Sequence, residues 1–284
     1  MLLLVLPFAA ASVVLQTHWW AVQLAPVAIW TIGLSFLLAT VALWLRSATL
    51  AGAGAGAVIT ASLMFSTTTF PYLPWQTAFI PVLAVAVLTG IATRAGRTQK
   101  ERLGIAERVE GRSAAQVAAN LGVAALVADD LAQSWLSGTH WFSAATLAPT
   151  PLFAAGLAAL AEAAADTASS ELGQVLSSRP RMITTLRHAE PGTDGAISLS
   201  GTLAGIAAAG IVAAAGALAL HGGWLMLAVS WAGGVFGLLF DSLLGATLER
   251  RGWLNNDAVN FLSTAGAAVF TLAIMFILPY FAQT

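Results

Sequence analysis

With 284 residues, of which 58% are hydrophobic and 9% are charged, the chain has too few charges to cover the surface of a soluble domain of its size. The composition excludes a water-soluble fold and predicts an integral membrane protein. Cysteine is absent, which excludes disulfide frameworks, thiol catalysis, thiolate metal sites and iron–sulfur clusters. The net charge of −1 indicates no partner by itself, so the positions of the charges must supply that information.

The apolar runs predict about nine transmembrane helices, in an all-α polytopic bundle that forms one domain over residues 1–284. A helix needs about 20 apolar residues to cross a hydrocarbon core about 30 Å thick, and polar, proline and glycine positions divide the runs accordingly. The expected spans are residues 1–16, 19–45, 47–66, 75–93, 113–136, 140–162, 196–220, 223–248 and 257–281. The first is short but lacks a basic leader and a cleavage site, so we expect a retained helix.

The Lys and Arg residues fall at connections that this count puts on one side of the membrane. They are Arg46, those of residues 94–112, those of residues 179–187, Arg250 and Arg251. An excess of basic residues marks the cytoplasmic side, so the amino terminus is predicted to be cytoplasmic. The alternate connections carry aromatic residues and histidines, which are typical of the outer interfacial belt. These are His18-Trp19-Trp20, Tyr72 with Trp75, His140-Trp141 and His221 with Trp224.

The first basic connection, residues 94–112, contains six basic and three acidic residues. For Arg94, Arg97 and Lys100 we expect a solvated loop that only sets the topology. Arg112 differs, because it leads directly into a helix on which Gln116 and Asn120 are spaced four apart and share one face. We expect Arg112 and Asn120 to contact a phosphate or a lipid headgroup, with a structural role as the equal alternative.

Residues 163–195 are predicted to form the cytoplasmic active-site segment. Glu162 and Asp166 share a helix face, and Thr167, Ser170 and Glu171 follow on the next turn. Ionisable groups at membrane depth are costly and are retained mainly for function, and oxygen-only clusters suit Mg²⁺. The structural alternative is a set of helix-end carboxylates paired with nearby arginines.

The second half of this segment has features that suit phosphate groups. Arg179 and Arg181 are of the type that contacts phosphates with two hydrogen bonds, and Thr184 follows them. The turn Pro191-Gly192-Thr193-Asp194-Gly195 opens the next span, where backbone N–H groups can meet an anion. Carboxylates, arginines and a glycine turn together predict a phosphoryl-transfer site.

Asp241 is the charged residue of the eighth span and must face protein or water rather than lipid. Asn256 and Asn260, one turn apart before and within the last span, are unexplained by a helix cap at Asp257. Asp129 and Asp130 lie toward the outer end of the fifth span. We interpret them as outer-face residues, with a proton or ion path as the alternative.

The sequence lacks the local motifs of several enzyme classes. It has no P-loop, and its single lysine, Lys100, lies in a loop, so a Walker lysine is missing. It also has no G-x-S-x-G or H-E-x-x-H motif, and its four histidines are scattered. Histidine-based metal or triad chemistry is therefore not expected.

Several blocks between residues 111 and 260 resemble the transmembrane protein 19 family, whose plant branch includes phytyl-phosphate kinase. The blocks are Gly111-Arg112 with Gln116-Val117 and Asn120-Leu121-Gly122, residues 165–173, residues 179–185, residues 191–195, residues 241–246 and residues 255–260. The resemblance implies an enzyme that transfers a phosphate from a nucleoside triphosphate, CTP or ATP, to an isoprenyl monophosphate in the membrane. Nucleic acid is not an expected partner.

With this resemblance, each candidate residue receives a role. The catalytic residues are expected to be Asp166, Glu171 and Asp241. The Mg²⁺ ligands are expected to be Asp166, Glu171, Asp194 and Asp241. The phosphate-binding residues are expected to be Arg112, Asn120, Ser170, Arg179, Arg181, Thr184, Thr193, Asn256 and Asn260. The active site is then on the cytoplasmic side of the membrane.

Two other functions use similar residues and stay open at this point. One is a transporter or flippase for a lipid phosphate or a small solute, whose site usually lies near the bilayer midplane. The other is a CTP-dependent nucleotidyltransferase acting on a lipid phosphate. The one-sided position of the polar segment favours an interfacial enzyme.

The predicted topology is testable by cysteine accessibility, because the chain has no native cysteine. Cysteines replacing Arg102, Arg187 and Arg251 are expected to react from the cytoplasmic side, and cysteines replacing His140 and Thr284 from the outer side. Labelling of Arg187→Cys and His140→Cys from the same side would contradict the predicted arrangement.

Overall fold

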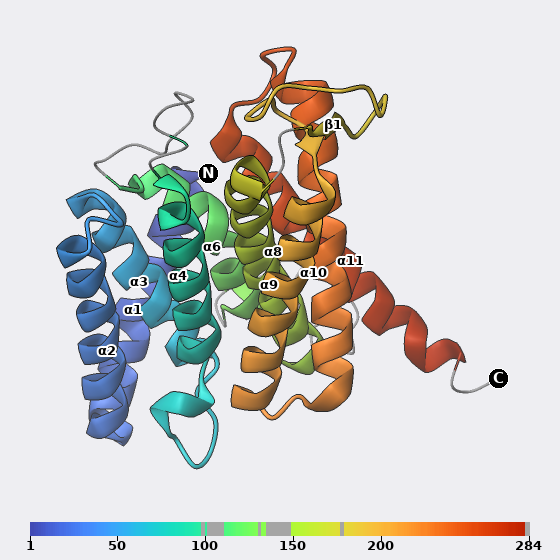
Figure 1. Cartoon of the computed structure of the whole chain (residues 1–284). Helices are drawn as coiled ribbons and strands as arrows, with labels where there is room; N and C mark the ends of the chain where they lie inside the picture. Colours follow the sequence, from blue (N-terminus) through green and yellow to red (C-terminus); the bar gives the residue numbers. More distant parts are fainter. Residues whose placement is uncertain (98–99, 101–110, 130–131, 135–148, 177–178, 282–284) are drawn as a thin grey trace.

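The computed structural model describes residues 1–97, 100, 111–129, 132–134, 149–176 and 179–281. Within these residues nine helices of 15 or more residues pack into a bundle, which confirms the all-α class (Figure 1). They are α1 (Leu2–Gln23), α2 (Ala25–Trp44), α3 (Leu50–Ser66), α4 (Phe79–Arg94), α6 (Ala114–Ala128), α8 (Pro149–Leu176), α9 (Leu199–Ala219), α10 (Gly223–Leu244) and α11 (Asn256–Phe281). Shorter elements are the 3₁₀ turn Pro74–Gln76, the π-helical turn Gly245–Glu249 and the strands β1 (Arg181–Met182) and β2 (Ala196–Ile197).

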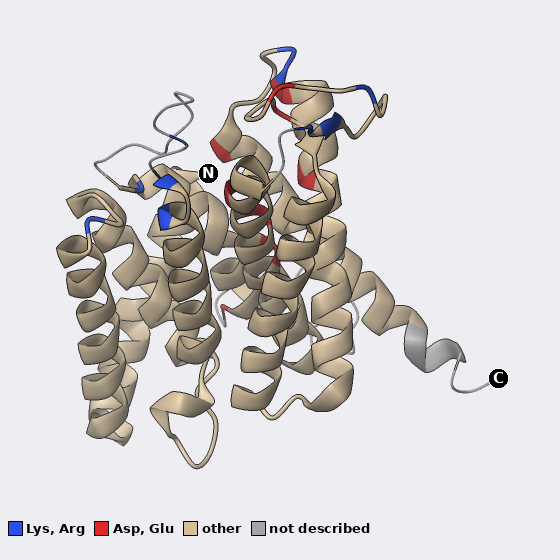
Figure 2. Ribbon diagram, viewed as in Figure 1, with Lys and Arg blue, Asp and Glu red and all other residues tan. Residues whose placement is uncertain are grey.

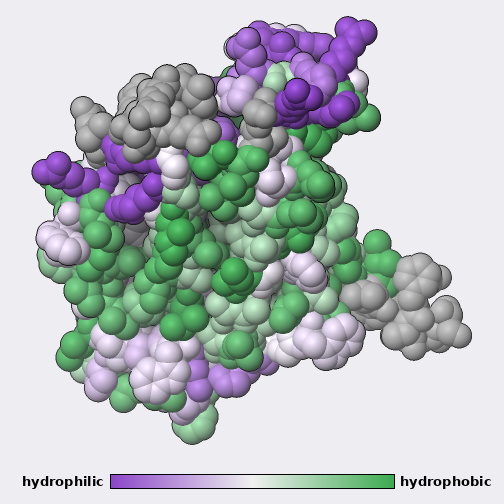
Figure 3. All heavy atoms as spheres, viewed as in Figure 1, coloured by the Kyte–Doolittle hydropathy of each residue, from purple (hydrophilic) through white to green (hydrophobic). Residues whose placement is uncertain are grey.

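Length and composition fit several helices to a bilayer. In the described part of the chain, α1, α2, α9, α10 with its π-helical turn, and α11 as far as Ile277 are long and apolar enough to cross a membrane. Helices α3, α4 and α6 are apolar but shorter. The outer surface carries a broad hydrophobic belt between two more hydrophilic ends (Figure 3). Leu3, Phe36 and Leu218 are among the exposed side chains of this surface. In water each would forgo about 1.5–3 kcal/mol of burial, so this surface suits lipid.

The boundary between the first two helices differs from the expected one. Helix α1 continues to Gln23 and includes His18-Trp19-Trp20, which were expected in a connection. The chain breaks at Leu24 instead, and Pro26 occupies the first turn of α2. Proline is tolerated there because the N–H groups of a first turn have no partner within the helix. The break therefore follows the proline rather than the polar and aromatic residues.

The basic residues that the structure describes gather at one end of the bundle, which we call the basic end (Figure 2). This segregation agrees with the pattern of connections in the sequence, and the amino terminus lies at the same end. The assignment of that end to the cytoplasm stays a prediction. Arg102, Asp130, His140 and Thr284, which entered the topology argument, lie outside the described residues.

Helix α8 is the central helix of the bundle. It packs against α4, α6, α9, α10 and α11, and residues 154–165 are buried on every side. The expected sixth span ended at residue 162, but α8 continues without a break to Leu176. A helix that is covered on every side by other helices can carry a polar residue in its interior without facing lipid. Glu162 therefore does not need to mark a helix end. Instead it lies within the bundle, with 1% of its surface exposed.

Close approach between α8 and its neighbours depends on small residues. At Gly205 of α9, a Cβ atom would lie 2.8 Å from the carbonyl oxygen of Ala165 and 2.7 Å from a methyl group of Leu238. A backbone oxygen cannot move away without shifting the helix. Gly205 therefore sets the distance between α8 and α9.

We expect Gly205→Ala to destabilise the protein by about 1–3 kcal/mol, because overpacking forces the two helices apart. The matched control is Gly33→Ala in α2, where nothing lies within 4 Å of an added Cβ. Apparent melting temperatures in detergent should fall by several degrees for Gly205→Ala and stay unchanged or rise for Gly33→Ala. Equal melting temperatures for the two variants would contradict the proposed close packing.

Candidate functional site

A cavity of about 260 Å³ lies between the second half of α8, the end of α10, the start of α11 and residues 180–198. We call it the acidic cavity. Carboxylates, hydroxyl groups and one amide contribute to its wall, and they come from segments far apart in the sequence. The ones that matter below are Asp166, Ser170, Thr193, Asp194, Asp241, Glu249 and Asn256.

Residues 180–197 fold back over this cavity. Strand β1 pairs with β2 in antiparallel register, Arg181 opposite Ile197, and the N–H of Ile183 donates to the carbonyl of Gly195 at 3.1 Å. Gly195 has a positive φ of 72°, and a Cβ there would lie 2.3 Å from the backbone nitrogen of Ala246. The loop is therefore seated directly on the π-helical turn at Gly245–Glu249. This contact holds Thr193 and Asp194 at the cavity, and single π turns are frequent at functional sites.

The acidic residues continue from the cavity into the core of the bundle. Asp166 and Asp241 interact with each other, and Glu162 acts electrostatically on both. Atom Oδ1 of Asp241 and both carboxylate oxygens of Glu162 are buried without a hydrogen-bond partner. Like charges in a low-dielectric site repel, so this arrangement needs bound protons or a cation for stability.

Glu171 acts electrostatically on Asp166 but does not line the acidic cavity, so the structure does not bring it together with the other expected metal ligands. The two residues are five positions apart, so they project from α8 about 140° from each other. Ser170, four positions from Asp166, does line the acidic cavity. Among the described residues no three Asp, Glu or His side chains converge closely enough to hold a metal ion by themselves. Three of the four expected metal ligands, Asp166, Asp194 and Asp241, line the acidic cavity, and Glu171 does not.

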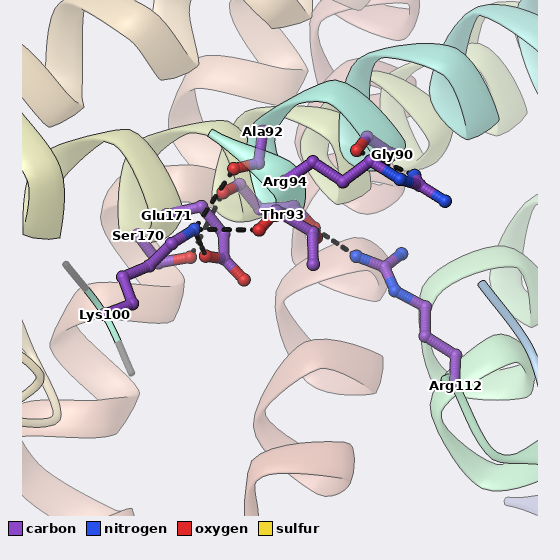
Figure 4. A network of polar contacts seen from close by, with 9 residues as sticks. Gly90, Ala92, Thr93, Arg94, Lys100, Arg112, Ser170 and Glu171 are labelled. Carbon is purple, nitrogen blue, oxygen red and sulfur yellow. Dashed lines mark hydrogen bonds and ion pairs between the residues drawn. The ribbon is translucent and has the colours of Figure 1, made fainter. Parts of the chain in front are cut away.

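Glu171 instead forms an ion pair with Lys100, which belongs to the connection after α4 (Figure 4). The Lys100 ammonium also donates to the carbonyls of Ala92 at 3.3 Å and Thr93 at 3.0 Å, at the end of α4. Lys100 is 1% exposed, so the expectation of a solvated lysine was wrong.

Arg112 and Asn120 lie away from the acidic cavity. The Arg112 guanidinium donates to the hydroxyl of Thr167 at 3.3 Å, on the side of α8 that faces α6. The side-chain amide of Asn260 donates to Oδ1 of Asn120 at 3.4 Å, and both residues are buried. The two asparagines, which were expected to bind phosphates, therefore contact each other between α6 and α11.

Ser170, Thr193 and Asn256 line the acidic cavity as expected phosphate ligands, but Arg179, Arg181 and Thr184 do not. Arg179, Arg181 and Thr184 are exposed, and Arg181 donates to the carbonyl of Leu186 at 3.0 Å. The reason is the alternation along β1, in which the apolar Met182 turns inward and Arg181 turns outward. Glu249 was not singled out from the sequence, although it lies eight residues after Asp241 and lines the same cavity.

The family of the chain follows from sequence comparison. Residues 33–268 match the family described as Integral membrane protein DUF92. The chain belongs to this family, and the predicted resemblance to transmembrane protein 19 is confirmed. No solved structure matches the chain significantly.

Three curated relatives are informative. The chain is 46% identical to an uncharacterised membrane protein of Methanocaldococcus jannaschii over 38% of this chain and 45% of that protein. It is 32% identical to an uncharacterised membrane protein of Synechocystis over 69% of this chain and 73% of the relative. It is 31% identical to Protein VTE6, chloroplastic, of Arabidopsis thaliana over 70% of this chain and 59% of the relative. The match therefore spans about half the length of two of these proteins.

The pairing of Lys100 with Glu171 generates a test of its structural role. Lys100→Met leaves a largely buried carboxylate without its cation, which costs about 3–5 kcal/mol, whereas replacing both partners by apolar residues is often nearly neutral. We expect Lys100→Met and Glu171→Met each to lower the apparent melting temperature clearly. The double variant should recover most of the loss, and additive losses would contradict the ion pair.

Proposed function

We propose that this protein is a membrane-embedded kinase that transfers the terminal phosphate of a nucleoside triphosphate to an isoprenyl monophosphate. The observation that carries the proposal is the acidic cavity at the basic end of the bundle. It combines carboxylates of α8, α10 and the π-helical turn with Thr193 and Asp194 of the loop above them. Family membership supports the same reaction, because the plant branch of the family includes phytyl-phosphate kinase.

The donor set of the cavity fits a hard divalent cation. All candidate ligands are oxygen atoms, and Oδ1 of Asp241 is buried without a partner. Mg²⁺ is usually held by one or two carboxylates together with waters and substrate phosphates, so a complete protein cage is not required. Asp166 and Asp241 would hold it together with waters and donor phosphates. Bound there, Mg²⁺ would neutralise the charge of the donor phosphates.

Polar groups around the carboxylates suit the phosphates of the donor. Ser170 and Thr193 offer hydroxyl groups, and Asn256 offers an amide at the start of α11. The helix start also contributes partial positive charge. In the transfer, a bond forms between an oxygen of the acceptor phosphate and the terminal phosphorus of the donor. The bond from that phosphorus to its bridging oxygen breaks, and the nucleoside diphosphate leaves.

The acceptor needs little help from a general base. A phosphate monoester at neutral pH already presents an ionised oxygen, so positioning and charge neutralisation carry the catalysis. The proposal therefore assigns binding and orientation, rather than proton transfer, to the residues of the cavity. The proposed cytoplasmic location agrees with the supply of nucleoside triphosphates on that side.

Product analysis with labelled nucleotide tests the reaction class. The purified protein is incubated with farnesyl monophosphate and with ATP or CTP labelled at either the α or the γ phosphate. A kinase releases the nucleoside diphosphate and moves the γ label to the lipid. A nucleotidyltransferase releases pyrophosphate and moves the α label, and a transporter consumes neither nucleotide.

We expect Asp166→Asn and Asp241→Asn each to lower phosphate transfer more than about 100-fold, since losing even an outer-shell partner of a metal ligand costs about 10–100-fold. Asp129→Asn is the matched control, because Asp129 caps α6 and accepts a hydrogen bond from Ser62 at 3.4 Å, away from the cavity. Without Mg²⁺, Asp241→Asn should not lower the melting temperature, because it removes a repulsion. Near-normal transfer by both cavity variants would reject the acidic cavity as the active site.

A further inference from the structure

A second cavity, of about 410 Å³, lies between α2, α3, α4 and α6. It is separate from the acidic cavity and its volume falls in the usual range of small-molecule sites, roughly 300–1,000 Å³. Most of its wall is apolar or formed by small residues. Leu38 of α2, Gly56 of α3, Val82 and Val85 of α4 and Leu121 of α6 are examples.

The part of this cavity nearest the basic end of the bundle is strongly basic. Four arginines and one lysine contribute to its wall, and no carboxylate does among the residues that the structure describes. They are Arg46, Arg94, Arg97, Lys100 and Arg112. Arg94 is the last residue of α4, and the other four belong to connections at the basic end of the bundle. We call this part of the cavity the cationic head and the apolar remainder the shaft.

Arg94 shows that this charge is not fully neutralised inside the protein. Its guanidinium donates to the carbonyls of Gly90 at 3.0 Å and Leu45 at 2.9 Å and to the hydroxyl of Ser47 at 3.2 Å. All three partners within the described residues are uncharged. The contacts hold the guanidinium at the head of the cavity and leave its positive charge available to an anion.

The shaft runs along the helices rather than across them. On α4 the wall extends from Val82 to Arg94, which corresponds to about 18 Å of helix. On α3 it follows Gly52, Gly56 and Thr60, which are spaced four apart and form one stripe. A long, narrow occupant with its anionic end at the arginines fits this shape.

The two cavities approach neighbouring faces of one turn of α8. Asp166 and Ser170 line the acidic cavity, whereas the adjacent Thr167 accepts a hydrogen bond from Arg112 of the cationic head. Figure 4 shows Lys100 against Glu171 of α8 and Arg112 directed toward the same polar network. Arg112 also acts electrostatically on Asp166. An anion held by the arginines would therefore lie next to the carboxylates of the other cavity.

We infer that this second cavity binds the lipid acceptor, a single-chain lipid monophosphate whose phosphate lies among Arg46, Arg94 and Arg112 and whose hydrocarbon chain lies in the shaft. This inference rests on the proposed kinase function for the identity of the acceptor. The turn of α8 from Asp166 to Glu171 then lies beside both the acceptor phosphate and the acidic cavity.

The apolar shaft and the cationic head contribute to lipid binding in different ways. The bilayer solvates a hydrocarbon chain about as well as an apolar cavity does, so the shaft adds little free energy and acts by shape. The phosphate gains charge-assisted hydrogen bonds that the bilayer does not offer, so the arginines supply the affinity. Filling the shaft and removing the charge should therefore both weaken binding, the first by exclusion and the second by lost attraction.

Equilibrium binding of radiolabelled farnesyl monophosphate, without nucleotide and Mg²⁺, tests the inference. Gly56→Leu adds a side chain to the shaft, and its Cβ would meet only Val117, at an ordinary 3.7 Å. Gly54→Leu is the matched control on the same helix, since nothing lies within 4 Å of its Cβ. Ala86→Leu fills the shaft from α4. Arg94→Gln removes the charge, with the exposed Arg187→Gln as control.

We expect Gly56→Leu, Ala86→Leu and Arg94→Gln each to raise the Kd for farnesyl monophosphate at least 10-fold, with no change for Gly54→Leu and Arg187→Gln. Farnesol should bind weakly and be insensitive to Arg94→Gln, and neither inorganic phosphate nor dioleoyl phosphatidic acid should compete well. Binding that is indifferent to the shaft variants and to Arg94→Gln would overturn the inference. So would equal competition by phosphatidic acid. Variant-sensitive binding without any phosphate transfer would support this lipid site while rejecting the kinase.

Discussion

Hydrocarbon cannot solvate charge, and this constraint explains the position of α8. The helix carries Glu162, Asp166 and Glu171, so it must lie where other helices can cover or neutralise them. The bundle places five helices around it. One carboxylate receives a lysine, one faces the acidic cavity with Asp241, and one is buried at the contact with α10 and α11. The rest of the architecture follows from surrounding this charged helix.

The surrounding helices divide into two groups according to which side of α8 they cover. Helices α9, α10 and α11 meet the side that carries Asp166, and α4 and α6 meet the side that carries Thr167 and Glu171. Negative charge collects on the first side and positive charge on the second. A single helix thus borders two environments of opposite charge on neighbouring faces, an arrangement suited to bringing a cation-bound donor and an anionic acceptor together.

Much of the fold could be predicted because it depends on composition and on the spacing of apolar residues. The span boundaries were less certain where the deciding feature was local. Pro26 set the first break, and tertiary cover carried α8 fourteen residues past Glu162. The sequence also brought out Asp166, Ser170, Thr193, Asp194, Asp241 and Asn256, which line one cavity, because charged and polar residues are rare in membrane spans.

Partners across the fold were harder to predict, because they depend on which faces of two helices meet. The sequence offered Arg179 and Arg181 as counterions for α8, but the alternation of β1 turns Arg181 outward. It offered Asn120 and Asn260 as phosphate ligands, but the crossing of α6 and α11 brings them together. Lys100 was treated as a loop residue, since nothing in its neighbourhood reveals that Glu171 lies against it.

The burial of Lys100 determines how the folded chain reacts with reagents that modify amines. The chain has one lysine, and its ammonium is enclosed by Glu171 and the carbonyls at the end of α4. Reagents that acylate lysine therefore find no accessible lysine side chain within the folded structure of these residues. Acylation of Lys100 would report the opening of the contact between α4 and α8, which gives a one-residue chemical measure of local unfolding in a membrane environment.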